Sequence, residues 1–149
     1  MTIYADTSFL VSWLYGKDTH HSKAAQWFAV NSREQWLISP WSEFEAINSL
    51  RGLCLRSPGP TPELSEALRR LFKRVIQTGR MEKLEVHWEL VLRDAAQISA
   101  AHAATVKCRA ADILHVAILE QLNPDTFVTG DGDQAALAIA RGFRAVTFY

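Results

Sequence analysis

Short runs of apolar residues alternate with longer amphipathic segments along the whole chain. The short runs predict β-strands at residues 2–6, 36–39, 83–86, 126–129 and 145–148. The longer segments carry apolar residues at helical spacing and predict helices at residues 7–15, 20–31, 40–55, 61–78, 88–105, 110–122 and 133–141. Strands that alternate with helices predict a parallel sheet covered on both faces, because right-handed crossovers place helices on each side.

We therefore expect a single domain over residues 1–149, with an α/β fold. Its predicted architecture is a three-layer α/β/α sandwich around a central parallel sheet of about five strands. A length of 149 residues with 48% hydrophobic residues is sufficient for a real core. The sequence Ser57-Pro58-Gly59-Pro60 separates two successive helices. These helices, at residues 40–78, are expected to project from the sandwich as a helical arm.

Composition narrows the class of protein further. No apolar run approaches the ~20 residues that a membrane span needs, and the first residues form a strand rather than a signal-type core. A cytoplasmic protein with no membrane association is the default expectation. The two cysteines, Cys54 and Cys108, have no zinc-type spacing and are expected to be reduced thiols on helices.

Four acidic residues are predicted to meet at one edge of the sheet. Asp6 closes the strand at 2–6 and Asp131 follows the strand at 126–129, while Glu45 and Asp112 lie near the starts of helices. The carboxyl ends of parallel strands gather at one edge, where ligands bind. Crowded carboxylates repel one another unless a cation compensates their charge. The pattern predicts a site for a hard metal ion, Mg²⁺ or Mn²⁺, with phosphate chemistry as its use.

Helix capping offers a local explanation for each of these acids. The capping candidates are Asp6, the Ser42–Glu45 pair as a capping box, Asp112 in a first helical turn, and the Asp131–Gln134 pair. Capping does not explain why two apolar strands both end in an aspartate. It also does not explain Asp133, a further acid two residues beyond Asp131.

The four acids lie in four segments whose order and spacing follow a known pattern. These segments are Ile3-Tyr4-Ala5-Asp6-Thr7-Ser8-Phe9-Leu10; Ile38-Ser39-Pro40 with Glu45-Ala46-Ile47-Asn48-Ser49-Leu50; Ala111-Asp112-Ile113-Leu114-His115-Val116-Ala117; and Val128-Thr129-Gly130-Asp131-Gly132-Asp133-Gln134. Together they resemble the PIN-domain family, and most of all its VapC-type ribonuclease toxins of type II toxin–antitoxin pairs. The Glu-x-x-Asn-x-Leu register selects Glu45 over Glu43. Gly130 departs from the family pattern, in which many relatives carry a bulkier residue.

The resemblance implies a metal-dependent endoribonuclease that hydrolyses RNA phosphodiesters. The implied catalytic and metal-binding residues, which would hold one or two Mg²⁺ or Mn²⁺ ions, are Asp6, Glu45, Asp112 and Asp131. Asp133 would act through water or tune the site. The resemblance also implies a small VapB-like antitoxin partner and a homodimer, with Leu10 and Leu14 near the dimer interface.

Several polar residues near the acids are candidates for supporting roles: Thr7, Ser8, Asn48, Arg109, His115 and Thr129. The three hydroxyls are expected either to donate hydrogen bonds to the carboxylates or to have no role. Asn48 either contacts substrate or holds Glu45, and Arg109 either contacts a phosphate or pairs with Asp112. His115, one turn after Asp112, is a metal or catalytic candidate or a structural histidine. His20 and His21 are expected to be exposed.

The net charge is zero, which argues against a strong, diffuse nucleic-acid binder. Charge is unevenly distributed, since residues 51–83 contain eight basic and three acidic residues. The cluster Arg69, Arg70, Lys73 and Arg74 is expected to steer RNA phosphates, with a solvated helix face as the alternative. An antitoxin segment is expected in a groove of the arm, with one of its own arginines in the acidic pocket.

Other functions remain open at this point. They are a PIN nuclease that is not a toxin, a PIN fold retained for RNA or protein binding, and a phosphohydrolase or phosphoacceptor domain that uses Asp6. The last lacks the second acid two residues after Asp6 that the haloacid-dehalogenase pattern requires, and a receiver-type lysine. The sequence identifies neither the RNA target nor the antitoxin.

Overall fold

Five parallel strands form the central sheet of this computed structural model, which describes all residues 1–149. The strands are β1 (Thr2–Ala5), β2 (Gln35–Ile38), β3 (Glu82–Lys83), β4 (Thr126–Thr129) and β5 (Ala145–Thr147), in the order β3-β2-β1-β4-β5. The central strand β1 pairs with β2 on one side and with β4 on the other. The strand order therefore reverses between β1 and β4, and ligands bind at the carboxyl edge of such a reversal.

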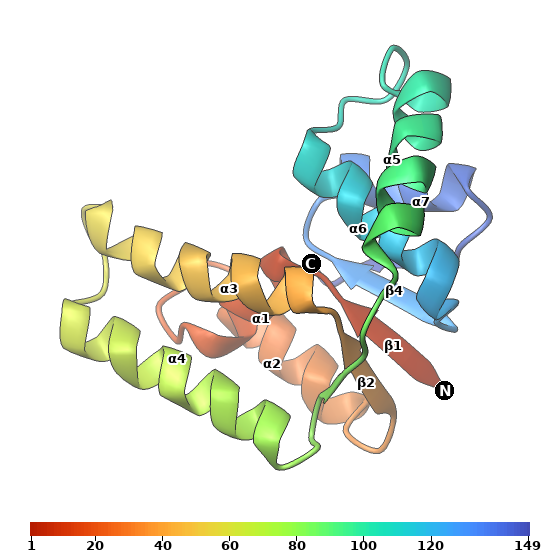
Figure 1. Cartoon of the computed structure of the whole chain (residues 1–149). Coiled ribbons are helices and arrows are strands. Elements are labelled where there is room, and N and C mark those ends of the chain that lie inside the picture. The colour runs from red at the N-terminus through yellow and green to blue at the C-terminus, as the bar shows by residue number, and fades with distance from the viewer.

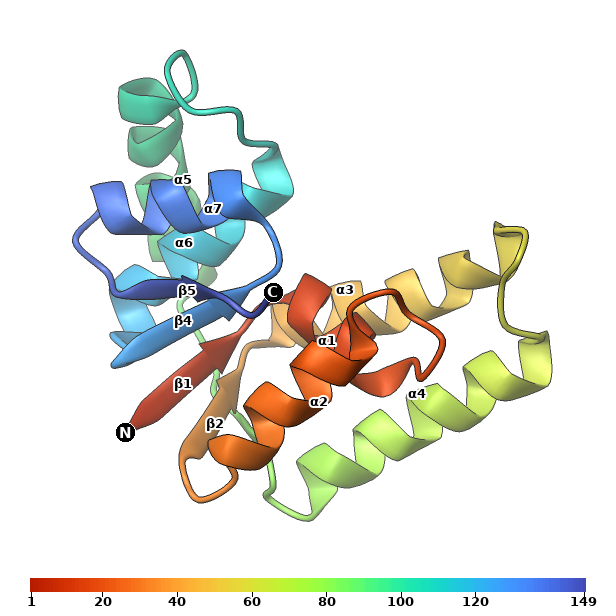
Figure 2. The same ribbon diagram turned by 180° about the vertical axis from the view of Figure 1, so that it is seen from behind.

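Seven α-helices surround the sheet. They are α1 (Thr7–Leu14), α2 (His21–Val30), α3 (Pro40–Gly52), α4 (Pro62–Gln77), α5 (Trp88–His102), α6 (Ala110–Leu122) and α7 (Gly132–Ala140). Figures 1 and 2 show α1 and α2 on one face of the sheet and α5, α6 and α7 on the other. This arrangement confirms the predicted three-layer sandwich. None of the helices combines the length and the apolar character that a membrane crossing requires.

Alternating side chains of the strands divide the core into two layers. Ile3 and Ala5 of β1 pack toward α1, α2 and the arm, while Tyr4 between them packs toward α5, α6 and α7. A strand buried on both faces must be apolar at every position, which explains the short uninterrupted apolar runs. Leu10 and Leu14 belong to the first layer and are buried in the chain's own core. The prediction that they contribute to a dimer interface is therefore wrong.

The helical arm consists of α3 and α4, which Figure 1 shows side by side and projecting from the sandwich. The predicted helix at 40–55 is α-helical only to Gly52, and a short 3₁₀ helix, Leu53–Leu55, follows it. Thr61 then caps α4 by accepting a hydrogen bond from the Leu64 amide at 3.2 Å. The buried Ser65 hydroxyl donates to the Leu50 carbonyl at 2.9 Å and ties the two helices together. The arm therefore forms as predicted from residues 40–78.

Most other elements lie within two residues of their predicted bounds, and β3 and α5 differ most. β3 contains only Glu82 and Lys83, both exposed at the sheet edge, although the Leu84 amide still donates to the Ile38 carbonyl at 3.0 Å. Short, charged edge strands prevent pairing with other chains. Helix α5 ends at His102 because the Thr105 amide and hydroxyl both donate to the His102 carbonyl and close a turn.

Candidate active site

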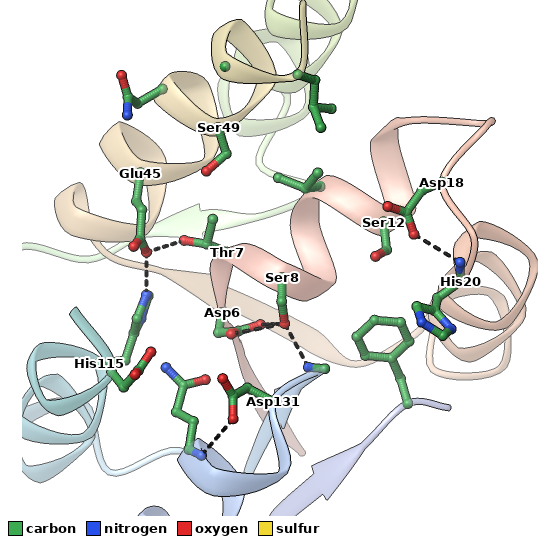
Figure 3. A pocket seen from close by; sticks show the side chains of 18 of the residues that line it. Asp6, Thr7, Ser8, Ser12, Asp18, His20, Glu45, Ser49, His115 and Asp131 are labelled. Carbon is green, nitrogen blue, oxygen red and sulfur yellow. Dashed lines mark hydrogen bonds and ion pairs between the residues drawn. The ribbon is translucent and has the colours of Figure 1, made fainter. Parts of the chain in front are cut away.

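A cavity of about 560 Å³ opens at the carboxyl edge of the sheet, beside the reversal between β1 and β4. All four predicted acids line it: Asp6 after β1, Glu45 on α3, Asp112 on α6 and Asp131 at the start of α7. Figure 3 shows Asp6, Glu45 and Asp131 turned toward this shared space. Four segments distant in sequence thus bring their carboxylates to one pocket.

Asp6 is the most deeply buried of the four acids, with only 4% of its surface exposed. It caps α1, because its Oδ1 accepts from the Phe9 amide at 2.9 Å. The Ser8 hydroxyl lies 2.8 and 3.0 Å from its two oxygens, and the Thr129 hydroxyl donates to Oδ2 at 2.9 Å. Burial raises the pKa of Asp6 above its ordinary value, although the charge of His115 and these hydrogen bonds act in the opposite direction. The protein alone therefore compensates this charge incompletely.

Glu45 faces the pocket, whereas Glu43 points elsewhere and pairs with Lys83 at 2.8 Å. The predicted Ser42–Glu45 capping box is wrong, since Ser39 is the N-cap and Ser42 its reciprocal partner. Glu45 is thereby free of any capping role, and its Oε2 accepts from Thr7 Oγ1 at 2.5 Å and His115 Nε2 at 2.8 Å. Partial burial acts to raise the pKa of Glu45, but these two hydrogen bonds and the charges of His115 and Arg109 together lower it.

Asp112 and Asp131 are both held by backbone amides at helix starts. Oδ2 of Asp112 accepts from the Arg109 amide at 2.7 Å, and the largely exposed Arg109 side chain lies 3.4 Å from the same oxygen. Oδ1 of Asp131 accepts from the amides of Asp133 and Gln134 at 2.9 and 3.1 Å. Asp131 is thus a cap, as predicted, but the Gln134 side chain contacts Thr129 Oγ1 at 2.7 Å instead of completing a box.

Three of the four carboxylates share one feature. Protein donors occupy one oxygen of Glu45, Asp112 and Asp131, while the second oxygen of each has no hydrogen-bond partner in the protein. None of these second oxygens is sealed from solvent. Each carboxylate is therefore fixed in orientation and still presents an available oxygen to the pocket.

This donor set suits a hard cation. Carboxylate oxygens are the ligands that Mg²⁺ and Mn²⁺ prefer, and Mg²⁺ is commonly held by one or two carboxylates with several waters. No three acidic, histidine or cysteine side chains converge closely enough to enclose an ion directly. An ion bound to the available oxygens would therefore keep part of its water shell.

A series of buried, hydrogen-bonded side chains holds Glu45 in position. His115 is 2% exposed, and its Nδ1 lies 3.0 Å from the hydroxyl of Tyr4. Burial raises the pKa of Tyr4, so its phenol keeps the proton. Nε2 of His115 contacts Glu45 while Nδ1 faces the Tyr4 hydroxyl, so the ring connects the two residues. The hydroxyls of Ser39 and Ser42, 3.0 and 2.7 Å from the Tyr4 oxygen, complete this series.

The other predicted residues divide into two groups. Thr7, Ser8, Asn48, Arg109 and His115 line the pocket, and Thr129 lies beneath Asp6. Asp133 is exposed and outside the lining. The four basic residues of α4 are also outside it; Arg70, Lys73 and Arg74 are exposed, whereas Arg69 is half-buried and pairs with Glu66 at 2.5 Å. Polar pocket residues that sequence reasoning did not select are Ser12, Asp18, His20, Ser49, Arg56 and Tyr149. A signal in the sequence exists for Tyr149 alone, because Gly130, which departs from the family pattern, lies against its ring.

The chain belongs to the PIN domain family, whose model matches residues 3–140. It shares its fold with VapC toxins and with chains of VapBC complexes. It resembles VapC20 of Mycobacterium tuberculosis, a sarcin-ricin loop cleaving toxin, at 18% identity and a TM-score of 0.70, over 95% of each chain. It also resembles VapBC2 of Rickettsia felis bound to a promoter fragment, at 12% identity and a TM-score of 0.70, over 99% of this chain and 98% of that chain.

A third similar structure is FitAcB of Neisseria gonorrhoeae, with 19% identity and a TM-score of 0.67 over 98% of this chain and 97% of that chain. No curated protein matches the sequence. At these low identities the structural matches establish the shared fold.

Proposed function

We propose that the protein is a Mg²⁺- or Mn²⁺-dependent endoribonuclease and the toxin of a VapBC-type toxin–antitoxin pair. The observation that carries the proposal is the set of fixed carboxylates in one pocket, three of them with an available oxygen. Membership of the PIN family and the shared fold with VapC toxins support it. Action on cellular RNA would place the protein in the cytoplasm.

The acids would have different roles in this proposal. Glu45, Asp112 and Asp131 would hold one or two ions through their available oxygens, and Asp133 would contribute only through water. Asp6 would supply the buried negative charge that makes cation binding favourable. When bound, the cation would lower the pKa of a water, orient it toward the phosphodiester and stabilise the leaving oxygen.

The remaining polar residues would orient these acids and the substrate. Thr7 and His115 hold Glu45, while Ser8 and Thr129 hold Asp6. The guanidinium of Arg109, whose side chain is 82% exposed, is free to contact an RNA phosphate. Arg56 and Asn48, which also line the pocket, would contact the RNA backbone on the side of the arm.

A phosphoacceptor role for Asp6 is less favourable. Both of its oxygens already accept hydrogen bonds, and only 4% of its surface is exposed. Attack on a phosphoryl group requires an accessible lone pair. An inactive RNA-binding or protein-binding module has no need of several carboxylates fixed around one pocket.

An antitoxin would bind along the arm, because the pocket extends along α3 through Ser49 and Gly52 to Leu53 of the 3₁₀ helix. Phe44 and Leu55 on this arm are 60% and 92% exposed and would offer apolar contacts to a partner. One arginine of the partner would pair with the acids, since a guanidinium binds carboxylates bidentately. We also propose a homodimer, as the family resemblance implies.

Cleavage assays on purified protein test the enzymatic proposal. Total cellular RNA should be cut with Mg²⁺ or Mn²⁺, and EDTA should abolish cleavage. Asp112→Asn should remove most activity. Asp94→Asn should retain it, because Asp94 lies on α5 outside the pocket and pairs only with the exposed Arg93. Equal cleavage by wild type and Asp112→Asn, or EDTA-resistant cleavage, would reject the proposed site.

Expression in the native host tests the toxin proposal separately. Active protein should arrest growth, and a tagged copy should recover a small partner that relieves the arrest. Harmless expression of active enzyme together with recovery of no partner would leave a PIN nuclease that is not a toxin.

A further inference from the structure

The end of the pocket opposite Glu45 contains an aromatic pair. The rings of His20 and Tyr149 are stacked with centroids 3.7 Å apart and planes 9° from parallel. Figure 3 shows His20 at the far side of the pocket from Glu45, with Asp6 between them. The pair therefore lies at the opposite end of the same cavity from the Glu45 anchor.

Within this pocket, these are the rings that a ligand can reach. Only four of the 21 lining residues are hydrophobic, so flat apolar surface is uncommon in this pocket. Among the lining rings, His115 is 2% exposed and Phe148 is 6% exposed, whereas Tyr149 is 49% exposed and His20 is half-buried. The His20 imidazole makes no hydrogen bond within the protein, because the hydrogen bonds of His20, to Asp18 and from Ala24, involve only its backbone. Flat apolar surface and free polar atoms thus occur together.

The sequence contains a specific adaptation that permits this position of Tyr149. A Cβ at Gly130 would lie 2.9 Å from a ring carbon of both Phe148 and Tyr149, and 3.0 Å from Ser8 Oγ. Any larger residue would displace one of these groups. Gly130 therefore allows the ring of Tyr149 to close over the end of β4.

Hydrogen bonds connect Tyr149 to the acidic centre. The Tyr149 hydroxyl donates to the Gly130 carbonyl, and the Gly130 amide donates to Ser8 Oγ at 2.6 Å. Ser8 in turn donates to Asp6, and Asp131 directly follows Gly130. The aromatic pair consequently has a fixed position relative to two of the four acids.

We propose that the His20–Tyr149 pair is a stacking platform for one unpaired nucleobase of the RNA, next to the phosphate held at the acids. This inference rests on the proposed nuclease function and adds a substrate subsite to it. Proteins recognise single-stranded RNA by stacking splayed bases on aromatic rings, and each stacked base contributes about 1–3 kcal/mol.

Nucleotide titration followed by NMR tests the platform. The wild type is titrated with AMP and with ribose 5-phosphate in Mg²⁺, because these probes share a phosphate and sugar and differ by the base. AMP should bind at least about fivefold more tightly, as expected from one stacked base. The ring signals of His20 should shift with AMP and not with ribose 5-phosphate.

Two variants separate stacking from a structural role of Tyr149. Tyr149→Phe keeps the ring but loses the hydrogen bond to Gly130, and should keep the preference for AMP. Tyr149→Leu removes the ring and should bind both probes equally. Should Tyr149→Leu fail to fold, His20→Ala on the opposite element provides the same test and should also reduce the preference.

The outcomes distinguish the platform from the nuclease proposal. Equal affinities of the two probes in wild type, or an unchanged preference in Tyr149→Leu and His20→Ala, would overturn the platform and leave the phosphate site intact. Absence of binding by either probe in Mg²⁺ would overturn the phosphate site and the platform together.

Discussion

Replacing Asp6 with asparagine should stabilise the metal-free protein. Asp6 is 4% exposed, and burial raises its pKa despite its hydrogen bonds, so its ionised form is a net cost to the fold near neutral pH. An asparagine fits the same contacts. Its Oδ1 can accept from Phe9 and Ser8, and its amide can donate to Thr129, whose hydroxyl then donates to Gln134 Oε1, 2.7 Å away.

The magnitude follows from two opposing contributions. Loss of charge assistance in the bonds from Phe9, Ser8 and Thr129 costs about 0.5–1 kcal/mol each. Removal of a desolvated charge raises the free energy of unfolding by several kcal/mol. The raised pKa shows that desolvation outweighs the bonds, so we expect a net gain of about 1–2 kcal/mol. For a chain of this length that is roughly 2–8 °C in melting temperature.

The sign of the pH dependence gives a stricter test. A raised pKa means that folded Asp6 retains its proton to higher pH than the unfolded chain does. The cost is therefore absent below the unfolded pKa of about 3.9 and increases as pH rises through the folded pKa. The melting difference between Asp6→Asn and wild type in EDTA should vanish near pH 4 and be largest near pH 7.

Calorimetry in EDTA and in Mg²⁺ measures these effects. Mg²⁺ should stabilise wild type more than Asp6→Asn, because the ion binds the charged site. Asp125→Asn is the matched control, since hydrogen bonds from Thr2 lower the pKa of this exposed acid and its loss should give no gain. If folded Asp6→Asn melts at or below wild type in EDTA at pH 7, the burial argument is wrong.

Three further changes test other parts of the structure. His115→Phe should lower the free energy of unfolding by about 2–3 kcal/mol in urea titrations and reduce RNA cleavage, because Glu45 loses its 2.8 Å donor. Tyr4→Phe should cost less, and equal costs of the two variants would contradict the role of His115 in holding Glu45. Gly130→Ala should cost about 1–3 kcal/mol in melting experiments and alter the near-UV circular dichroism, and an unchanged spectrum would contradict the close packing of Tyr149. Reversal of the α4 cluster Arg69, Arg70, Lys73 and Arg74 to glutamate should weaken RNA cleavage and reduce its salt dependence. An unaltered salt dependence would assign these residues to a solvated helix face.

The fold and the meeting of the acids could be predicted because both depend on local pattern and sheet geometry. Apolar runs fix the parallel strands, and strands that end in Asp6 and Asp131 must deliver them to one edge. Among the capping interpretations, those for Asp6 and Asp131 are confirmed, whereas the Ser42–Glu45 capping box was wrong although a signal was present. Proline is favoured in the first turn, so Pro40 already indicated Ser39 as the cap of α3.

Other parts of the site depend on tertiary contacts that leave no local pattern. In the sequence, Tyr4 is one more apolar position of a buried strand. No residue near it in the sequence indicates its hydrogen bond to His115. His20 follows a turn and is expected to be exposed, yet it is half-buried against Tyr149, 129 positions later in the chain. Such pairings become visible only when the sheet has brought the segments together.

The position of Tyr4 connects the fold to the proposed chemistry. It lies on the central strand, fully buried, in a layer otherwise built from aliphatic and aromatic side chains. A polar hydroxyl there is tolerated because His115, Ser39 and Ser42 satisfy it. The same contacts join β1, α3 and α6; Asp6 directly follows β1, Glu45 lies in the second turn of α3 and Asp112 in the first turn of α6. One buried hydrogen-bond network thus fixes the relative positions of the elements on which three of the four carboxylates depend.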